Sequence, residues 1–150
     1  MKKIMVIHGP NLNALGQRQP EIYGNQTLEQ INVQIEAEAR HLGCRIESHQ
    51  ANSEGAIIDL IQSCASDTGG IIINPAGYSH TSVAILDALL AAKIPTVEVH
   101  LSNLYRRDEF RQTMITARGA IGVISGFGAQ SYLLALRYLA NSTTQTPTNR

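Results

Sequence analysis

The sequence predicts an α/β protein, one domain in which helices cover both faces of a five-stranded parallel sheet. Three observations lead to this fold class. Short apolar runs alternate with amphipathic helical stretches from the start of the chain almost to its end. Neither an internal repeat nor a linker interrupts this alternation. A chain of 150 residues, 43% of them hydrophobic, can bury one sizeable core but is too short for two enzyme-sized domains.

The first strand and the first helix have the clearest signals. Residues 4–7 form a continuous apolar run, and a Gly-Pro turn follows shortly after it. Residues 27–41 place apolar side chains on one face at helical spacing. Thr27 and Gln30 fit a capping box at the start of this helix, and Gly43 supplies its end.

The middle of the chain continues the alternation. Residues 44–49 alternate weakly, which predicts a strand near a sheet edge. Residues 53–66 form the second helix. Two glycines then precede residues 71–73, an unbroken run of isoleucine that is typical of a central, buried strand. Residues 82–92 form a third helix that is apolar nearly all round.

The last third adds two strands and two helices. Residues 95–100 form the fourth strand and residues 120–124 the fifth, with a short polar helix at 106–116 between them. Residues 129–139 form the last helix. Residues 141–150 are rich in Thr, Ser, Pro and Asn, which predicts a disordered C-terminal tail.

Connection rules then limit the topology of the domain, which we place at residues 1–140. Right-handed crossovers make a flavodoxin-like three-layer fold with strand order 2-1-3-4-5 the simplest arrangement. In such sheets ligands bind beyond the carboxyl ends of the strands, at the switch point between strands 1 and 3. This rule selects three loops, at residues 8–24, 74–82 and 100–111.

Charge and cysteine content exclude several classes of protein. Twelve Lys and Arg residues balance twelve Asp and Glu residues, so we expect no nucleic-acid and no membrane partner. A neutral surface also favours self-association.

Cys44 and Cys64 lie in apolar stretches, as buried thiols do. The N-terminal apolar run is too short for a signal peptide, and no segment matches a membrane span, so we expect a cytoplasmic protein.

Polar side chains gather in the three selected loops. The loop after strand 1 carries Asn11, Arg18 and Tyr23, and it is roughly three times the usual length, which is typical of a lid. Asn74 and His80 follow strand 3. Taken singly, an Asn at a strand end is usually a turn residue and a lone His is usually structural. Together at one edge, they predict a small-molecule active site.

The missing motifs narrow the chemistry to acid and base catalysis. The chain has no GxGxxG, Walker lysine, HExxH or GxSxG, and Lys93 lies at the wrong edge of the sheet for an imine. Tyr23 can act as a base if Arg18 lowers its pKa. His100 suits the acid, because imidazole exchanges protons near neutral pH. Glu98 shares a face with His100 and is placed to orient a neighbouring histidine such as His80, or to hold its charge.

Five segments carry a more specific pattern. In chain order they are Gly9-Pro10-Asn11-Leu12-Asn13 with Leu15-Gly16, Arg18 and Tyr23-Gly24, Ser48-His49-Gln50 with Asn52-Ser53-Glu54-Gly55, Asn74-Pro75 with Tyr78-Ser79-His80-Thr81-Ser82, Glu98-Val99-His100-Leu101-Ser102-Asn103, and Gly126-Phe127-Gly128-Ala129-Gln130. Together they resemble type II 3-dehydroquinate dehydratase over about residues 3–140.

This resemblance implies a specific reaction and assembly. It implies the dehydration of 3-dehydroquinate to 3-dehydroshikimate by an anti elimination through an enolate. The reaction serves the shikimate pathway of aromatic amino acid biosynthesis, or quinate catabolism. The resemblance further implies a flavodoxin-like fold, a homododecamer built as a tetramer of trimers, and neither a metal nor an organic cofactor.

The resemblance also assigns roles to residues. Tyr23 corresponds to the base, Arg18 to the lid arginine that lowers its pKa, Asn11 to the residue that holds a water at the enolate oxygen, and His100 to the acid. Asp87 corresponds to a residue that reaches a neighbouring subunit's site. Glu98 and Arg107 match supporting positions. Substrate hydroxyls and carboxylate would be bound by Asn74, His80, Arg111 and the backbone N–H groups of Leu101 and Ser102.

Three rival interpretations stay open on sequence alone. A non-catalytic flavodoxin-like module could bind an anionic metabolite, but it would not need Tyr23 or His100. A different sugar-acid dehydratase or isomerase could use the same acid and base. A structural oligomer could keep a relict site. Measured turnover would exclude the first and third interpretations, because neither is an enzyme. A panel of substrates tests the second.

Overall fold

A computed structural model describes residues 1–17 and 19–142 of the chain. It contains a five-stranded sheet with the order β2-β1-β3-β4-β5, and every neighbouring pair of strands is parallel. The parallel sheet and the predicted strand order are therefore confirmed. The strands are β1 (Lys3–His8), β2 (Arg45–Gln50), β3 (Thr68–Asn74), β4 (Thr96–His100) and β5 (Gly122–Ser125).

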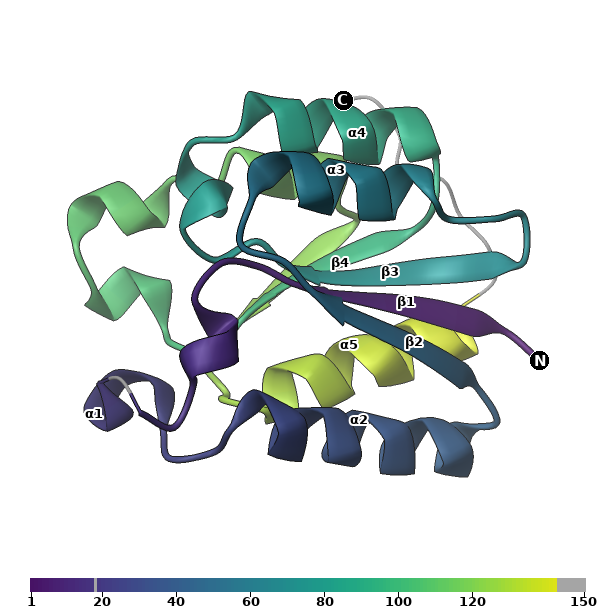
Figure 1. The fold of residues 1–150 in the computed structure, drawn as a ribbon, viewed down its shortest axis with the longest axis horizontal. Coiled ribbons are helices and arrows are strands. Elements are labelled where there is room, and N and C mark those ends of the chain that lie inside the picture. Colours follow the sequence, from purple (N-terminus) through teal and green to yellow (C-terminus); the bar gives the residue numbers. More distant parts are fainter. Residues whose placement is uncertain (18, 143–150) are drawn as a thin grey trace.

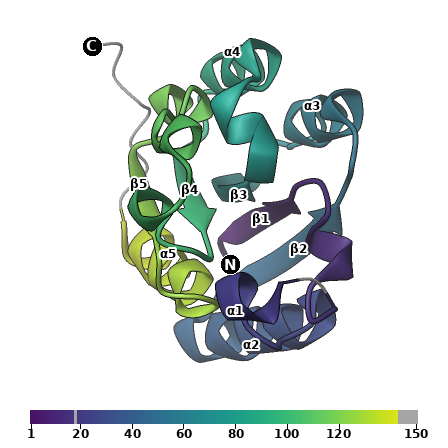
Figure 2. The same ribbon diagram turned by 90° about the vertical axis from the view of Figure 1, so that its left-hand side faces the viewer.

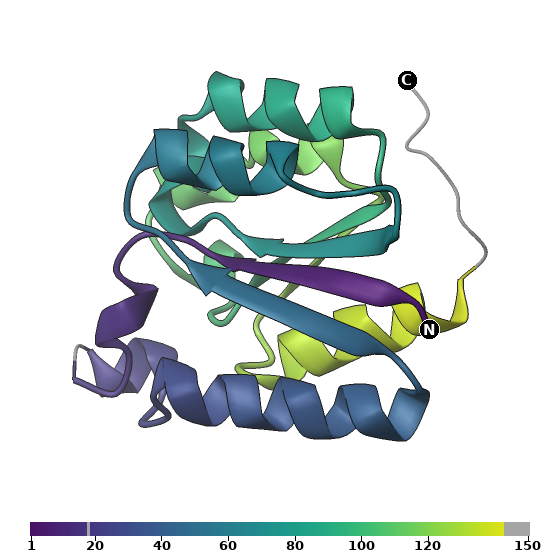
Figure 3. The same cartoon turned by 45° about the vertical axis from the view of Figure 1, so that its right-hand side comes forward.

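Helices cover both faces of the sheet, which gives the predicted three layers (Figures 1 and 3). α2 (Leu28–Leu42) and α5 (Gln130–Asn141) pack together on one face. α3 (Glu54–Gln62) and α4 (Val83–Ala92) pack together on the other. A short helix, α1 (Pro20–Tyr23), lies in the long connection between β1 and α2. Within the described ranges, no helix combines the length and the apolar character needed to cross a membrane.

The central strands are apolar on both faces, which explains their unbroken hydrophobic runs. Side chains alternate between the two faces of a strand, so β1 and β3 supply both layers of the core. Burying each such side chain stabilises the fold by roughly 1.5–3 kcal/mol. Ile4, Val6 and Ile72 face α2 and α5, whereas Met5, Ile7, Ile71 and Ile73 face α3 and α4.

Helix ends follow the predicted capping residues. Thr27 Oγ1 accepts from the backbone N–H of Gln30 (3.2 Å) while Gln30 Oε1 accepts from that of Thr27 (2.9 Å), so the capping box is confirmed. Gly43 ends α2 in the left-handed conformation, with φ 75°. Ser53 and Ser82 cap α3 and α4 by accepting from the backbone N–H three residues further on.

Several boundaries differ from the sequence prediction. α3 ends at Gln62 rather than at residue 66, where the Ser63 hydroxyl turns back to donate to a backbone carbonyl of the helix. β3 begins at Thr68, so it includes the two glycines that were expected to precede it. α5 continues through Asn141, so this residue is helical rather than part of the tail. The rest of the predicted tail, from residue 143, lies outside the described residues.

The short polar helix predicted at residues 106–116 is wrong. The segment forms three separate 3₁₀ turns, Leu104–Arg106, Glu109–Gln112 and Thr116–Gly119. It has no apolar face that packing could stabilise. The Ile115 N–H donates instead to the Ser79 carbonyl (2.7 Å), so hydrogen bonds to another segment replace helical ones.

Candidate active site

A cavity of about 130 Å³ opens at the carboxyl edge of the sheet, beyond β1, β3 and β4. Figure 2 views this edge, with the segments after the three strands arranged around it. This is the switch point that the strand order predicts. The cavity is lined by Pro10, Asn11, Leu12, Asn74, Ala76, Gly77, His80, His100, Leu101, Ser102, Leu104, Arg107 and Arg111.

A second cavity of about 230 Å³ is larger but offers little chemistry. It is lined mainly by Ala and Ile side chains, with Gln62 and Cys64 as its polar members. It contains neither an acid–base pair nor a charged group among its lining residues. The candidate site is therefore identified by its converging polar groups and not by its size.

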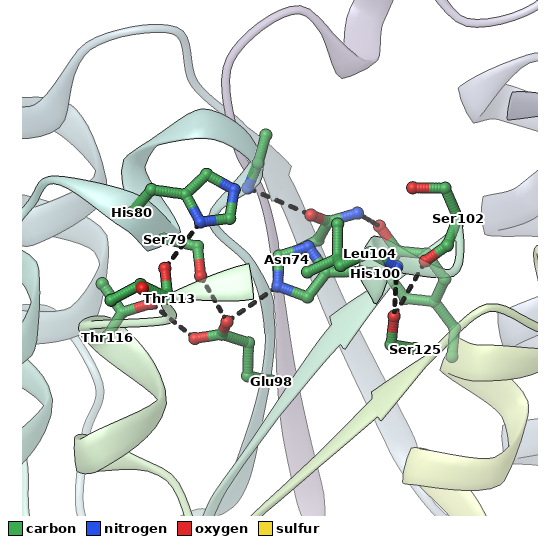
Figure 4. Close-up of polar contacts among 12 residues, drawn as sticks. Asn74, Ser79, His80, Glu98, His100, Ser102, Leu104, Thr113, Thr116 and Ser125 are labelled. Atoms are coloured by element: carbon green, nitrogen blue, oxygen red, sulfur yellow. Dashed lines mark hydrogen bonds and ion pairs between the residues drawn. The ribbon is translucent and has the colours of Figure 1, made fainter. Parts of the chain in front are cut away.

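His100 and Glu98 form a buried pair beside the first cavity. Nε2 of His100 lies 2.7 Å from Oε2 of Glu98, and the two side chains are 5% and 0% exposed. Ser79 also donates to Oε2 (2.7 Å), and Thr116 donates to Oε1. Three donors thus offset the cost of burying this carboxylate. Glu98 contacts His100 rather than His80, and it leaves Nδ1 of His100 as the remaining ring nitrogen (Figure 4).

His80 is held by a different partner. Its Nδ1 lies 2.8 Å from the carbonyl oxygen of Thr113, which can only accept, so Nδ1 carries the hydrogen. The ring stacks on His100 with centroids 6.4 Å apart. Burial lowers the pKa of His80 below its usual value, which favours the neutral ring at neutral pH. Nε2 of His80 is then an acceptor for a substrate hydroxyl.

Two arginines make the cavity suitable for an anion. Arg107 donates to the Ser102 hydroxyl (3.3 Å). The guanidinium of Arg111 lies over the ring of Phe110, 5.0 Å from its centroid, and 3.6 Å from Asp108. Both side chains reach the cavity because the segment folds into 3₁₀ turns instead of one helix.

The loop that follows β4 is fixed by β5. Ser125 Oγ donates to the carbonyl oxygen of Ser102 (2.8 Å) and accepts from the Leu104 N–H (3.3 Å). Figure 4 shows Ser125 bridging this loop from its neighbouring strand. The backbone of Leu101 and Ser102 is thereby held in place where it lines the cavity.

Asn74 and Asn11 are positioned by the backbone around them. Asn74 is the last residue of β3 and 3% exposed, and its Oδ1 accepts from the Ala76 N–H (3.1 Å). Asn11 is exposed, has φ 70°, and its N–H donates to Oδ1 of Asn52 (3.0 Å). Gly9 lets the two loops touch, because a Cβ there would lie 2.7 Å from the Asn74 carbonyl oxygen.

The remaining predicted site residues belong to the long connection after β1 and to α4. Tyr23 is the last residue of α1, which stands at the same edge of the sheet (Figure 2), and Arg18 lies outside the described residues. Asp87 is exposed on α4 and does not line the cavity. In the described part of the chain, no group of three or more His, Cys, Asp or Glu side chains is arranged to hold a metal ion.

Several residues that organise the site are not among those predicted from the sequence. Three of them, Ser79, Thr116 and Ser125, form hydrogen bonds with residues that lie 18 to 23 positions away in the sequence. No local sequence pattern predicts such contacts. His8 and Tyr132 contact each other across 124 residues. A polar residue at the end of an apolar strand was the only signal for His8.

Comparison with known proteins identifies the family of this chain. The family model for class II dehydroquinase matches residues 2–140. A 3-dehydroquinate dehydratase from Geotalea daltonii is 57% identical over 139 residues, 93% of this chain and 96% of the relative. The crystal structure of a type II dehydroquinase from Butyrivibrio crossotus has a TM-score of 0.91 at 43% identity, covering 94% of this chain and 98% of that one.

A more distant structure shares the same fold. A 3-dehydroquinate dehydratase-like protein from Bifidobacterium longum has a TM-score of 0.69 at 27% identity, covering 93% of this chain and 96% of the other. The match of the family model to nearly the whole chain, together with relatives of more than half identity, settles the family. The chain belongs to the class II dehydroquinase family.

Proposed function

We propose that this chain removes water from 3-dehydroquinate, giving 3-dehydroshikimate, by an anti elimination through an enolate. Membership of the family gives the reaction, a dehydration in the shikimate pathway. The observation that carries the proposed route is the buried pairing of Glu98 with His100 at 2.7 Å, on the wall of a cavity that two arginines also line. Such a pair can hold a histidine as a proton donor to a leaving group.

Elimination requires a base, an enolate stabiliser and an acid. Tyr23, as its phenolate, takes the proton alpha to the ketone, and the positive charge of Arg18 favours that phenolate. A water held by Asn11 stabilises the enolate oxygen. The enolate then re-forms the ketone and expels the hydroxyl group, which His100 protonates. One C–H and one C–O bond break, one C=C bond forms, and water leaves.

The substrate is a polyhydroxylated carboxylate, and the cavity offers matching partners. Arg111 and the N–H groups of Leu101 and Ser102 bind the carboxylate. Asn74 and His80 bind hydroxyl groups. Arg107 supports this arrangement through its hydrogen bond to Ser102 (3.3 Å).

The reaction is tested by mixing purified protein with 3-dehydroquinate and following the ultraviolet absorbance of the conjugated product. Parallel samples contain EDTA, or protein that was first treated with 3-dehydroquinate and borohydride and then freed of both. Absorbance that grows equally in all three supports a route without metal or imine. If folded protein produces no such absorbance, the proposed activity is rejected. A panel of other polyhydroxy acids then tests whether the chain is a different dehydratase or an isomerase.

The stereochemical course is tested with labelled substrate. The substrate carries deuterium in place of the alpha hydrogen that lies anti to the leaving hydroxyl. Loss of the label from the product supports anti elimination. Full retention of the label contradicts it, and it would place the base on the other face of the substrate.

The proposal also covers the oligomeric state and the cellular location. The chain forms a homododecamer, built as a tetramer of trimers, and it is located in the cytoplasm. Val83, Asp87 and Leu90 all lie exposed on α4 at helical spacing, as a subunit contact through that helix requires. Light scattering should give about twelve times the 16.3 kDa of one chain. If Asp87 serves a neighbouring site, mixed oligomers of Asp87→Ala and His100→Ala chains should regain activity that neither variant has alone.

A further inference from the structure

A buried chain of hydrogen bonds leads from α2 to the cavity. Oδ1 of Asn32 lies 2.8 Å from Nε2 of His8, and Nδ1 of His8 lies 3.0 Å from the Tyr132 hydroxyl. The same hydroxyl lies 3.1 Å from Nδ2 of Asn74. His8 and Tyr132 are both 0% exposed. Of these four residues only Asn74 lines the cavity, so the chain ends at the candidate active site.

The direction of each hydrogen bond in this chain is fixed. Oδ1 of Asn32 can only accept, so Nε2 of His8 donates. Burial lowers the pKa of His8 to about 4, so the ring is neutral at neutral pH and Nδ1 is an acceptor. Burial also raises the pKa of Tyr132, which therefore keeps its proton and donates it to His8. The Tyr132 oxygen is then free to accept from Nδ2 of Asn74.

This direction determines how Asn74 faces the cavity. One Nδ2 hydrogen goes to Tyr132, while Oδ1 accepts from the Ala76 N–H (3.1 Å). A flipped amide would place Oδ1 against a hydroxyl whose hydrogen is already used, and the NH₂ group against another N–H. Both contacts would be lost, so the amide is held in one orientation. Its second Nδ2 hydrogen is available as a donor.

We propose that His8 and Tyr132 are positioning residues, which hold the Asn74 side chain as a hydrogen-bond donor to a substrate oxygen. This inference rests on the proposed function, in which Asn74 binds a hydroxyl group of the substrate. Neither His8 nor Tyr132 lines the cavity, so their effect passes through Asn74. In this proposal the hydroxyl group that Asn74 binds is one that stays on the product, so loss of the contact should weaken binding more than the chemical step.

The direct test is Tyr132→Phe, which removes one oxygen and keeps the ring. We expect KM for 3-dehydroquinate to rise about tenfold and kcat to change less than threefold, measured by product absorbance. Tyr138→Phe is the matched control, because this exposed tyrosine lies on the same helix, α5. It should leave both constants unchanged.

A double-mutant cycle separates positioning from general destabilisation. In an Asn74→Ala background, Tyr132→Phe should no longer raise KM, although it should still lower Tm. An equal rise of KM in both backgrounds overturns the inference, as does an unchanged KM in Tyr132→Phe alone. If the wild-type protein turns over no 3-dehydroquinate, both the proposed function and this inference are rejected. If the wild type is active and either of the two contradicting KM results is found, only the inference is rejected.

Substitution of His8 gives an independent test if Tyr132→Phe does not fold. His8→Asn keeps an oxygen near the place of Nδ1, which can accept from Tyr132, whereas His8→Ala removes the acceptor. We expect KM close to wild type for His8→Asn and raised several-fold for His8→Ala. Equal KM values for the two variants contradict the inference.

Discussion

At the scale of single residues, the site depends on the carboxylate of Glu98. It is fully buried, and it receives hydrogen bonds from His100, Ser79 and Thr116. In Glu98→Gln an NH₂ group replaces one oxygen and meets these donors, so His100 loses its fixed position. We expect kcat to fall about 100-fold and the free energy of unfolding by about 1–3 kcal/mol.

The control for this prediction is Glu109→Gln, because Glu109 is exposed in a 3₁₀ turn of the neighbouring segment. Both variants are measured for kcat by product absorbance and for stability by Tm. A Glu98→Gln enzyme that keeps kcat within threefold of wild type would show that the pair is not part of the proton transfer.

The residue scale also marks the limit of what the sequence predicts about the site. Polar residues in the loops after β1, β3 and β4, such as Asn11 and His80, line the cavity as expected, because parallel strands end at one edge. The partners behind them were missed. Glu98 pairs with His100 rather than His80, and Ser79 and Thr116 donate to it from other segments. Nothing in the local sequence of Ser79 or Thr116 indicates those contacts.

At the scale of elements, the approach of the β1 and β3 loops depends on Gly9. Its N–H donates to the Asn74 carbonyl oxygen (2.8 Å), and an added Cβ would lie 2.7 Å from that oxygen. Gly9→Ala must therefore push apart the loops that carry Asn11 and Asn74. We expect a lower Tm and a fall of at least tenfold in kcat/KM.

The matched control is Gly55→Ala on α3. A Cβ there meets nothing within 4 Å, and alanine favours a helix over glycine by about 0.5–1 kcal/mol. Gly55→Ala should therefore raise Tm slightly and leave kcat/KM unchanged. If Gly9→Ala and Gly55→Ala behave alike, close packing of the two loops is not what positions the site.

Most elements could be predicted because each has a strong local signal. The apolar runs of β1 and β3 and the capping box of α2 agree with the packing around them. The segment 106–116 could not be predicted in this way. Its conformation is set by contacts with residues far along the chain, such as the Ile115 N–H to Ser79, and not by its own periodicity.

At the scale of the whole molecule, buried His8 makes stability depend on pH. Burial lowers its pKa from 6.5 to about 4 in the folded state, so between these values the unfolded chain binds the extra proton. Stability therefore falls as the pH drops from about 7 to 4, by roughly 3 kcal/mol from this group, and the loss is complete below pH 4. His8→Asn removes this contribution.

Tm measured from pH 7 to pH 4 checks this prediction. The wild type should lose more Tm over this interval than His8→Asn, because the carboxyl groups that titrate there are common to both. Parallel curves for the two proteins would mean that His8 is not buried as a neutral ring.

The central claim is that Tyr23 and His100 are the base and acid of an elimination. The most direct measurement is kcat for 3-dehydroquinate in Tyr23→Phe and in His100→Ala, with Tyr138→Phe as the control. We expect each of the first two to lower kcat at least 1,000-fold, within the range that general acid–base groups contribute, and the control to match wild type. A Tyr23→Phe or His100→Ala enzyme that keeps kcat within tenfold of wild type would contradict the claim.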